Sequence, residues 1–185
     1  MTGFRLSKGL IAGIIVAVTV LVVVMMVVLA YNDMVSKDQG VKGHWSDVEV
    51  AYQRKMELIP TMYDIVNMTM DFEYSLYLNV TEARNIWESL SGNTEEKMNA
   101  STQIDNAFEV FVNAVSEAYP DPTVTPGVVL TFMDQYESTT NQVASERKFY
   151  NDAVREYNTA IRSFPNVLFA EAFGFEEAVY YSQGM

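Results

Sequence analysis

Residues 127–164 read GVVLTFMDQYESTTNQVASERKFYNDAVREYNTAIRSF. Two interleaved series of every seventh residue form one largely apolar stripe, which is typical of a helix packed along partner helices. The stretch has no Gly or Pro after Gly127, and Pro165 stops it. At ~1.5 Å per residue the predicted helix is about 55 Å long, so its partners must also be long. The two series are Val129, Tyr136, Val143, Tyr150, Tyr157 and Phe164, and Met133, Thr140, Arg147, Val154, Ile161 and Leu168.

Three earlier segments have similar stripes and predict the partner helices. The first follows the apolar N-terminal run and extends to about Ile59, the second covers about Thr61 to Leu90, and the third about Thr94 to Ala118. Pro60 is either a kink or part of the first turn of a new helix. We therefore predict an all-α fold, in which an N-terminal single-pass transmembrane helix precedes an antiparallel four-helix bundle of long helices.

The predicted domain organisation has three parts. Residues 1–30 form the N-terminal segment and transmembrane helix, residues 31–175 form the bundle, and residues 176–185 form a C-terminal tail. Within the bundle region, the apolar residues that follow Pro165 are expected to close one end.

Leu10 to Ala30 contains 21 residues without a charge. At ~1.5 Å per residue this run is about 31 Å long, which matches the hydrocarbon core of a bilayer. An uncleaved anchor is the simplest interpretation. The alternatives are a secretory signal, for which the run is long, and an archaeal type IV pilin signal cleaved after Gly9.

The basic residues around the apolar run favour a cytoplasmic N-terminus only slightly. Three N-glycosylation sequons lie beyond the run, at Asn67, Asn79 and Asn99. Together these features predict a single-pass protein of the cell membrane with an extracytoplasmic bundle.

The composition excludes several classes of site. The net charge is −12, so the chain should repel nucleic acid, and it has no cysteine and one histidine, His44. We expect no catalytic activity, no cofactor and no metal site. We expect the protein to self-associate as a homo-oligomer, because it has eleven methionines and a second apolar face on the Thr61 to Leu90 helix. We also expect a protein partner, which the sequence does not identify.

Several residues in the stripes have side chains that need polar partners. Arg147 should be paired with a glutamate of another helix, for which Glu57, Glu82 and Glu117 are candidates; an anion site is the alternative. The Tyr-Asn pairs at 150–151 and 157–158 should be structural, and the Asn side chains can bond across helices. The cluster around Arg54 and Lys55 is expected to be a solvated face. The structural residues predicted on these grounds are Arg147, Tyr150, Asn151, Tyr157, Asn158, Pro60 and Pro165.

A set of short motifs recurs in order along the chain beyond the apolar run. They are Tyr31-Asn32-x-x-Val35, Trp45-x-x-Val48, Arg54-Lys55-x-x-Leu58-Ile59-Pro60, Thr81-Glu82-Ala83-Arg84, Glu117-x-Tyr119-Pro120, and Glu137, Asn141 and Arg147-x-x-Tyr150-Asn151-x-x-Val154-x-x-Tyr157-Asn158-x-x-Ile161-x-x-Phe164-Pro165.

These motifs resemble the LemA family of membrane-anchored helical proteins. The resemblance implies a membrane-tethered antiparallel bundle and supplies no catalytic residues. The chain departs from the family pattern at Thr61, where Asn is usual, and in the loop from Pro122 to Pro126. The function expected is therefore a membrane-anchored scaffold or adaptor. The alternatives are a subunit of a surface filament with the apolar helix in its core, and a ligand sensor or enzyme that uses the bundle interior.

Overall fold

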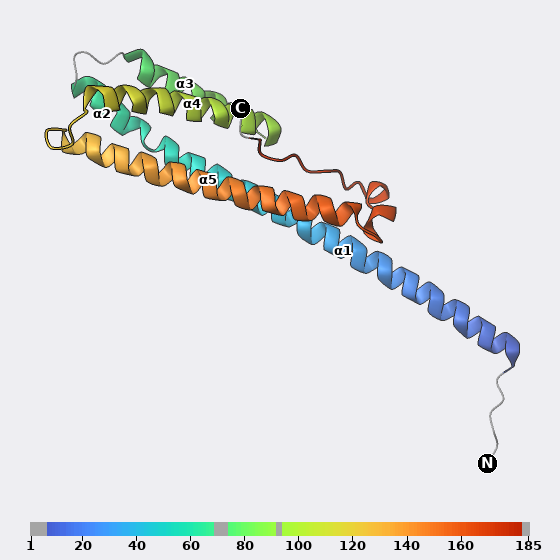
Figure 1. The fold of residues 1–185 in the computed structure, drawn as a ribbon. Coiled ribbons are helices and arrows are strands. Elements are labelled where there is room, and N and C mark those ends of the chain that lie inside the picture. Colours follow the sequence, from blue (N-terminus) through green and yellow to red (C-terminus); the bar gives the residue numbers. More distant parts are fainter. Residues whose placement is uncertain (1–6, 69–73, 92–93, 183–185) are drawn as a thin grey trace. The chain divides into compact units, whose positions relative to one another are not determined.

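The computed structural model describes residues 7–68, 74–91 and 94–182, and in these residues the chain is helical with no β-strand. The all-α class predicted from the stripes is confirmed. Figure 1 shows the helices in chain order. They are α1 (Lys8–Met56), α2 (Ile59–Met68), α3 (Tyr74–Ser89), α4 (Thr94–Ala118), α5 (Gly127–Arg162) and the short 3-10 helices η1 (Asn166–Leu168) and η2 (Glu171–Phe173).

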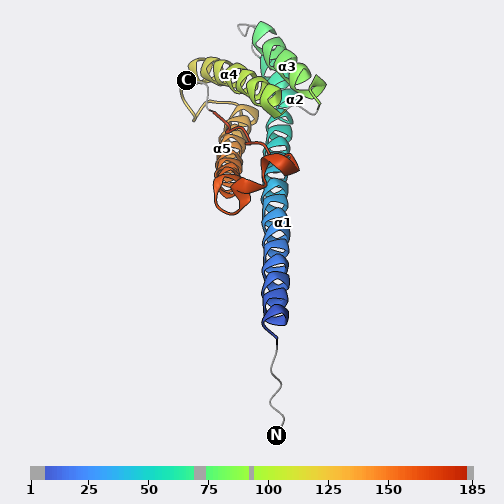
Figure 2. The same ribbon diagram turned by 90° about the vertical axis from the view of Figure 1, so that its right-hand side faces the viewer.

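Helix α1 joins two segments that the sequence had suggested as separate helices. The apolar run and the first bundle segment form one helix, Lys8–Met56, which is unbroken in both views (Figures 1 and 2). It contains the one stretch of the described residues that is long and apolar enough to cross a membrane, with a mean hydropathy of 3.2. None of that stretch is buried against the rest of the protein.

The predicted helix from Thr61 to Leu90 is wrong as a single element. The ring of Tyr63 in α2 lies 5.4 Å from the ring of Tyr77 in α3. Residues 14 apart on one helix would be about 21 Å apart along its axis, so the chain reverses between the two helices. Residues 69–73, where part of the prediction falls, lie outside the described residues. Pro60 is in the first turn of α2, which is one of the two alternatives that the sequence left open.

The other two predicted helices agree with the structure. Helix α4 has the predicted bounds, and α5 ends at Arg162, three residues before Pro165. Six of the twelve stripe positions are buried and four more are partly buried. Phe164 and Leu168 are exposed instead, because they follow the end of the helix and the heptad spacing no longer sets their direction.

The chain divides into two compact units, each of which takes part of α1 and part of α5. The first unit comprises Met1–Val41 and Ala153–Ala178, and the second comprises Lys42–Asp152 and Val179–Met185. In the first unit, Met34, Ala160 and Ile161 are buried, and the ring of Tyr31 lies 5.2 Å from that of Phe173. Gly174 ends η2 with φ of 77°, a left-handed conformation that a side chain disfavours.

The second unit has an aromatic and aliphatic core. Helices α3 and α4 lie side by side in it (Figures 1 and 2), and the indole N–H of Trp87 donates to the hydroxyl of Ser101 at 3.2 Å. Spacings of three and four residues along α4 point its apolar side chains into this core. The buried residues of α4 include Met98, Ile104, Phe108, Phe111 and Val115.

Candidate functional site

Three charged side chains meet inside the second unit. Asp105 of α4 accepts a hydrogen bond from Lys55 Nζ of α1 at 2.7 Å on Oδ1, and its Oδ2 is paired with Nη2 of Arg147 from α5. The hydroxyl of Tyr52 donates to Oδ2 at 2.8 Å. Only 2% of the Lys55 side chain is exposed, against 26% for Asp105. We call Lys55, Asp105 and Arg147 the charge cluster.

Aromatic rings cover both cations of the charge cluster. Lys55 Nζ lies 5.3 Å from the ring centroid of Phe108 and 5.2 Å from that of Tyr136. The guanidinium carbon of Arg147 lies 4.3 Å from the ring centroid of Tyr181 and 5.3 Å from that of Tyr52. The negative faces of these rings attract the cations and partly replace the water that burial removes.

Burial shifts the pKa of two members of the charge cluster, Asp105 and Arg147. It raises the pKa of Asp105, although attraction to and a hydrogen bond from Lys55 oppose this effect, and it lowers the pKa of Arg147. With Lys55 and Arg147 protonated and Asp105 ionised, the cluster carries one excess positive charge. The Nε atom of Arg147 is buried without a hydrogen-bond partner. The arrangement can therefore cross-link three helices, and its excess charge could also hold an anion.

The partner predicted for Arg147 is wrong, although a carboxylate of another helix does pair with it. Glu57, Glu82 and Glu117 are all exposed, and Asp105 occupies the position. Lys55 was expected on a solvated face and is buried instead. The signal for Lys55 was present: it continues the seven-residue series Met34, Val41 and Val48.

Among the described residues, the side chains of the Tyr-Asn pairs of α5 hydrogen-bond to the C-terminal tail and not to another helix, which corrects the predicted bonding of the Asn side chains. In the first unit, Asn158 Oδ1 accepts from the N–H of Ala178 and its Nδ2 donates to the Ala178 carbonyl, both at 2.9 Å. The hydroxyl of Tyr157 donates to the carbonyl of Glu176 at 2.8 Å. The amide side chain thus satisfies both backbone groups of one tail residue.

The second unit repeats this arrangement. Asn151 accepts from the N–H of Tyr181 at 2.7 Å and donates to its carbonyl at 3.0 Å, while the hydroxyl of Tyr150 donates to the carbonyl of Val179 at 2.9 Å. Seven helical residues rise about 10.5 Å, and three extended residues span about 10 Å. This match explains why Tyr-Asn pairs one heptad apart bind tail residues three apart.

Replacing Asn158 with alanine should release the tail locally. The change removes two hydrogen bonds of about 1 kcal/mol each, so amide exchange at Ala178 should become roughly thirtyfold faster. Hydrogen–deuterium exchange measures this effect. Asn141→Ala, an exposed substitution on the same helix, is the control and should leave exchange unchanged. Equal protection of Ala178 in the Asn158 and Asn141 variants would show that the two bonds do not hold the tail.

The buried tyrosines make the protein sensitive to alkali. Burial raises the pKa of Tyr150 and of Tyr181 from 10.0 to about 12. An unfolded tyrosine ionises near pH 10, whereas these two keep their protons when folded. The stability they contribute is therefore complete below pH 10 and is lost as the pH rises toward 12.

Tyrosinate absorbance during an alkaline titration should reveal Tyr150 and Tyr181 as the last groups to ionise, after Tyr136 and Tyr157, whose pKa burial also raises. The Tyr150→Phe variant should lack one of them and lose less stability over the same pH range. Complete titration of all tyrosines near pH 10 in the folded protein would contradict the effect of burial.

The remaining sequence candidates are not brought to the charge cluster by any described contact. Pro60 lies in α2, and Pro165 precedes η1. His44 Nδ1 lies 3.5 Å from Asp47. The described residues contain no group of three His, Asp or Glu side chains arranged to hold a metal ion. The sequon residues Asn67, Asn79 and Asn99 are exposed.

Over the described residues, the fold and the charge cluster define an all-helical protein with one segment long and apolar enough to span a membrane and a charged interior that links its helices. The LemA family model matches residues 44–184, which is most of the chain and includes the C-terminal tail. The chain belongs to the LemA family, as its motifs predicted. No curated protein sequence matches the chain significantly.

Proposed function

We propose that the protein is a membrane-anchored scaffold or adaptor, in which a single span tethers an antiparallel helical bundle that binds other proteins and has no catalytic activity. The observation that carries the proposal is the continuity of α1. Its apolar part is exposed along its length, and the same helix continues into the packed core at Val48 and Tyr52. An apolar surface of this size is stable in lipid and unfavourable in water.

The contacts within the first unit support an antiparallel arrangement of α1 and its partner segment. In the first unit, Asp33 of α1 contacts Asn166, and Lys37, one turn further along α1, pairs with Glu156, ten residues earlier in the chain. A later residue of α1 therefore contacts an earlier residue of the partner segment, which is the order expected for antiparallel segments. The charge cluster supports a structural role for the interior, because each of its three charges has a partner of opposite sign on another helix.

Extraction of membranes at alkaline pH tests the anchor. The full chain should stay in the membrane pellet, and a Val20→Lys, Val23→Lys variant should be released, because each central lysine costs about 2.5–3.5 kcal/mol on insertion. Val124→Lys is the matched control, since Val124 is equally apolar but lies in the loop between α4 and α5. Release of the unaltered chain would end the proposal.

Self-association is the second part of the proposal. Exposed apolar and aromatic side chains of α2 and α3, among them Met68, Tyr74 and Leu78, offer a surface for a second copy. Chemical cross-linking in native membranes should trap a homo-oligomer, and Tyr74→Ser with Leu78→Ser should reduce its yield. A monomeric mass under conditions that preserve the fold would exclude this part of the proposal.

The orientation we propose places the bundle outside the cell. Its support is the slight excess of basic residues before the apolar run and the exposure of all three sequon residues. Protease added to sealed cells should remove the bundle. Protection in intact cells with cleavage only after lysis would reverse the orientation.

One observation favours an anion sensor as a second candidate function. The charge cluster has an excess positive charge, and Nε of Arg147 is buried without a partner. A sensor requires that inorganic phosphate or sulfate raises the melting temperature of the protein and that Arg147→Met abolishes this effect without loss of basal stability. A scaffold predicts no anion effect and a less stable Arg147→Met protein.

A further inference from the structure

A group of apolar side chains lies exposed in the segment that follows α5. Phe164 is 72% exposed, Val167 50%, Leu168 62% and Phe173 42%. We call residues 163–175 the apolar flap. Four large apolar side chains within ten residues are an unusual surface to leave in water, and such patches mark contacts with protein or lipid. Their position relative to α1 identifies the contact.

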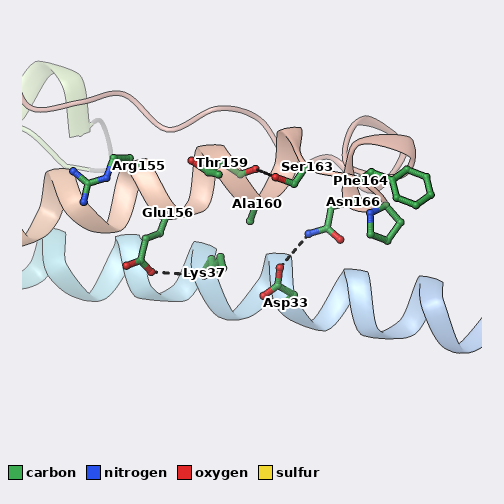
Figure 3. Close-up of a pocket in the computed structure, with 10 residues that line it drawn as sticks. Asp33, Lys37, Arg155, Glu156, Thr159, Ala160, Ser163, Phe164 and Asn166 are labelled. Carbon is green, nitrogen blue, oxygen red and sulfur yellow. Dashed lines mark hydrogen bonds and ion pairs between the residues drawn. The ribbon is translucent and has the colours of Figure 1, made fainter.

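Two sets of interactions fix the apolar flap to α1 within the first unit. The amide of Asn166 donates to Asp33 Oδ2 at 3.0 Å, as Figure 3 shows. The rings of Phe173 and Phe175 lie 5.2 Å and 5.8 Å from the ring of Tyr31. Tyr31 directly follows Ala30, where the uncharged run ends, and Asp33 lies three residues, or about 4.5 Å, beyond that point along the helix. The apolar flap therefore lies at the level where the run ends.

A groove joins the apolar run to the flap. It has a volume of 450 Å³ and is lined mainly by apolar side chains. On one side are Val22, Met25, Met26 and Leu29 from the last turns of the apolar run, and on the other is Pro165. Leu10–Ala30 matches the thickness of the hydrocarbon core of a bilayer. When this run spans the core, the groove that its last turns line lies at the depth of the acyl chains.

The charges of the flap indicate the type of contact. Residues 163–175 contain no Lys or Arg, and Glu171 is their one charged side chain. The flap itself therefore offers no attraction to anionic headgroups, and burial of its apolar surface is the driving force that it supplies. Tyr31 supplies an amphipathic ring at the same level, where tyrosine is commonly found in membrane proteins.

We propose that the apolar flap is a second membrane contact, in which Phe164, Val167, Leu168 and Phe173 insert into the interface of the leaflet from which α1 emerges. A lipid acyl chain occupies the groove between the flap and α1. The depth of insertion is that of interfacial elements, about 5–10 Å into the boundary between headgroups and acyl chains. The inference rests on the proposed function in one respect, namely that Leu10 to Ala30 spans the bilayer.

Lipid contact can be measured at single positions, because the chain has no native cysteine. Leu168→Cys in the flap, Leu21→Cys in the apolar run and Glu156→Cys in α5 would each be labelled with an environment-sensitive fluorophore. The full-length proteins would be placed in phosphatidylcholine nanodiscs with and without lipids that carry a nitroxide quencher high on the acyl chain. Glu156 is the water-exposed control, because its partner Lys37 lies seven residues, or about 10 Å, beyond Ala30.

The expected result is strong quenching and blue-shifted emission at Leu168 and little quenching at Glu156. A deep quencher should act more strongly on Leu21 than on Leu168. Because the contact is apolar, replacing some phosphatidylcholine with anionic lipid should leave the quenching at Leu168 unchanged. Phe164→Cys should reproduce the Leu168 result, and thermal melts should show that the labelled proteins remain folded.

Two outcomes overturn the inference, and they differ from the outcome that overturns the anchor. Quenching at Leu21 with none at Leu168 means that the span exists and the flap faces water. A blue shift at Leu168 without quenching means that protein, such as a second copy of the chain, covers the flap. Absence of quenching at both positions overturns the span and the flap contact together.

Discussion

The Asp105→Asn protein should lose about 3–5 kcal/mol of its free energy of unfolding, because the change leaves buried Lys55 and partly buried Arg147 without a counter-charge. Lys55 is almost completely buried, and Asp105 is the carboxylate that pairs with both Lys55 and Arg147. Asparagine keeps the size of the side chain, so the loss reports charge and not packing. Chemical denaturation of the full chain in detergent micelles, followed by circular dichroism, measures it.

Two further variants separate the charge effect from a general sensitivity to substitution. Glu177→Gln breaks the exposed pair with Arg162 and should cost no more than about 1 kcal/mol. Replacing the whole charge cluster with apolar residues, as in Lys55→Met, Asp105→Leu, Arg147→Met, should recover much of the stability that Asp105→Asn loses. If the Asp105→Asn protein is as stable as the parent, the charge cluster does not hold the helices together.

The Tyr150→Ala protein should lose about 3 kcal/mol, since a large buried ring is replaced by a cavity. The hydroxyl of Tyr150 also donates to the carbonyl of Val179, and Tyr150→Phe should isolate that bond at about 1 kcal/mol. The ring of Trp45, 5.5 Å away, loses an edge-on partner in the alanine variant alone. Denaturation under the same conditions gives both values.

The control for Tyr150 is Glu156→Ala on the same helix. Glu156 is exposed, and its pair with Lys37 is long at 3.6 Å, so the change should cost at most about 0.5 kcal/mol. Equal losses for Tyr150→Ala and Glu156→Ala would mean that the buried face of α5 has been assigned incorrectly.

The periodicity of the sequence predicted the helices and most of their buried faces. It identified α4 with its bounds and the buried side of α5, because a stripe at helical spacing must face the core wherever the partner lies. The same rule failed at Phe164 and Leu168, since both lie beyond the last helical residue, Arg162, and the spacing of a helix has no meaning there.

The sequence predicted which side of a helix is buried more readily than which residues of different segments contact each other. The sequence indicated that Arg147 needs a carboxylate, but periodicity does not determine which residue of another helix lies opposite, and Asp105 was missed. The tail was missed for a related reason. An Asn beside a stripe can bond to a helix or to an extended chain, and the sequence of residues 176–182 has no pattern that marks it as the partner of Asn151 and Asn158.

The break between α2 and α3 was missed because the segment carries no strong helix-breaking residue. Neither Gly nor Pro occurs from Thr61 to Leu90, and the residues of this segment have ordinary helix propensity. The tertiary contact of Tyr63 with Tyr77 requires the reversal, and such contacts override local propensity.

The intact mass of the protein recovered from alkali-washed native membranes distinguishes a retained membrane anchor from a cleaved N-terminal segment. An uncleaved anchor leaves the protein in the pellet with a mass of at least the 20.9 kDa of these 185 residues, and deglycosylation should remove any excess. A mass that lacks the first nine residues would indicate a filament subunit with a processed N-terminus. A mass that lacks the first thirty would indicate a secreted protein, and either result would contradict the anchor.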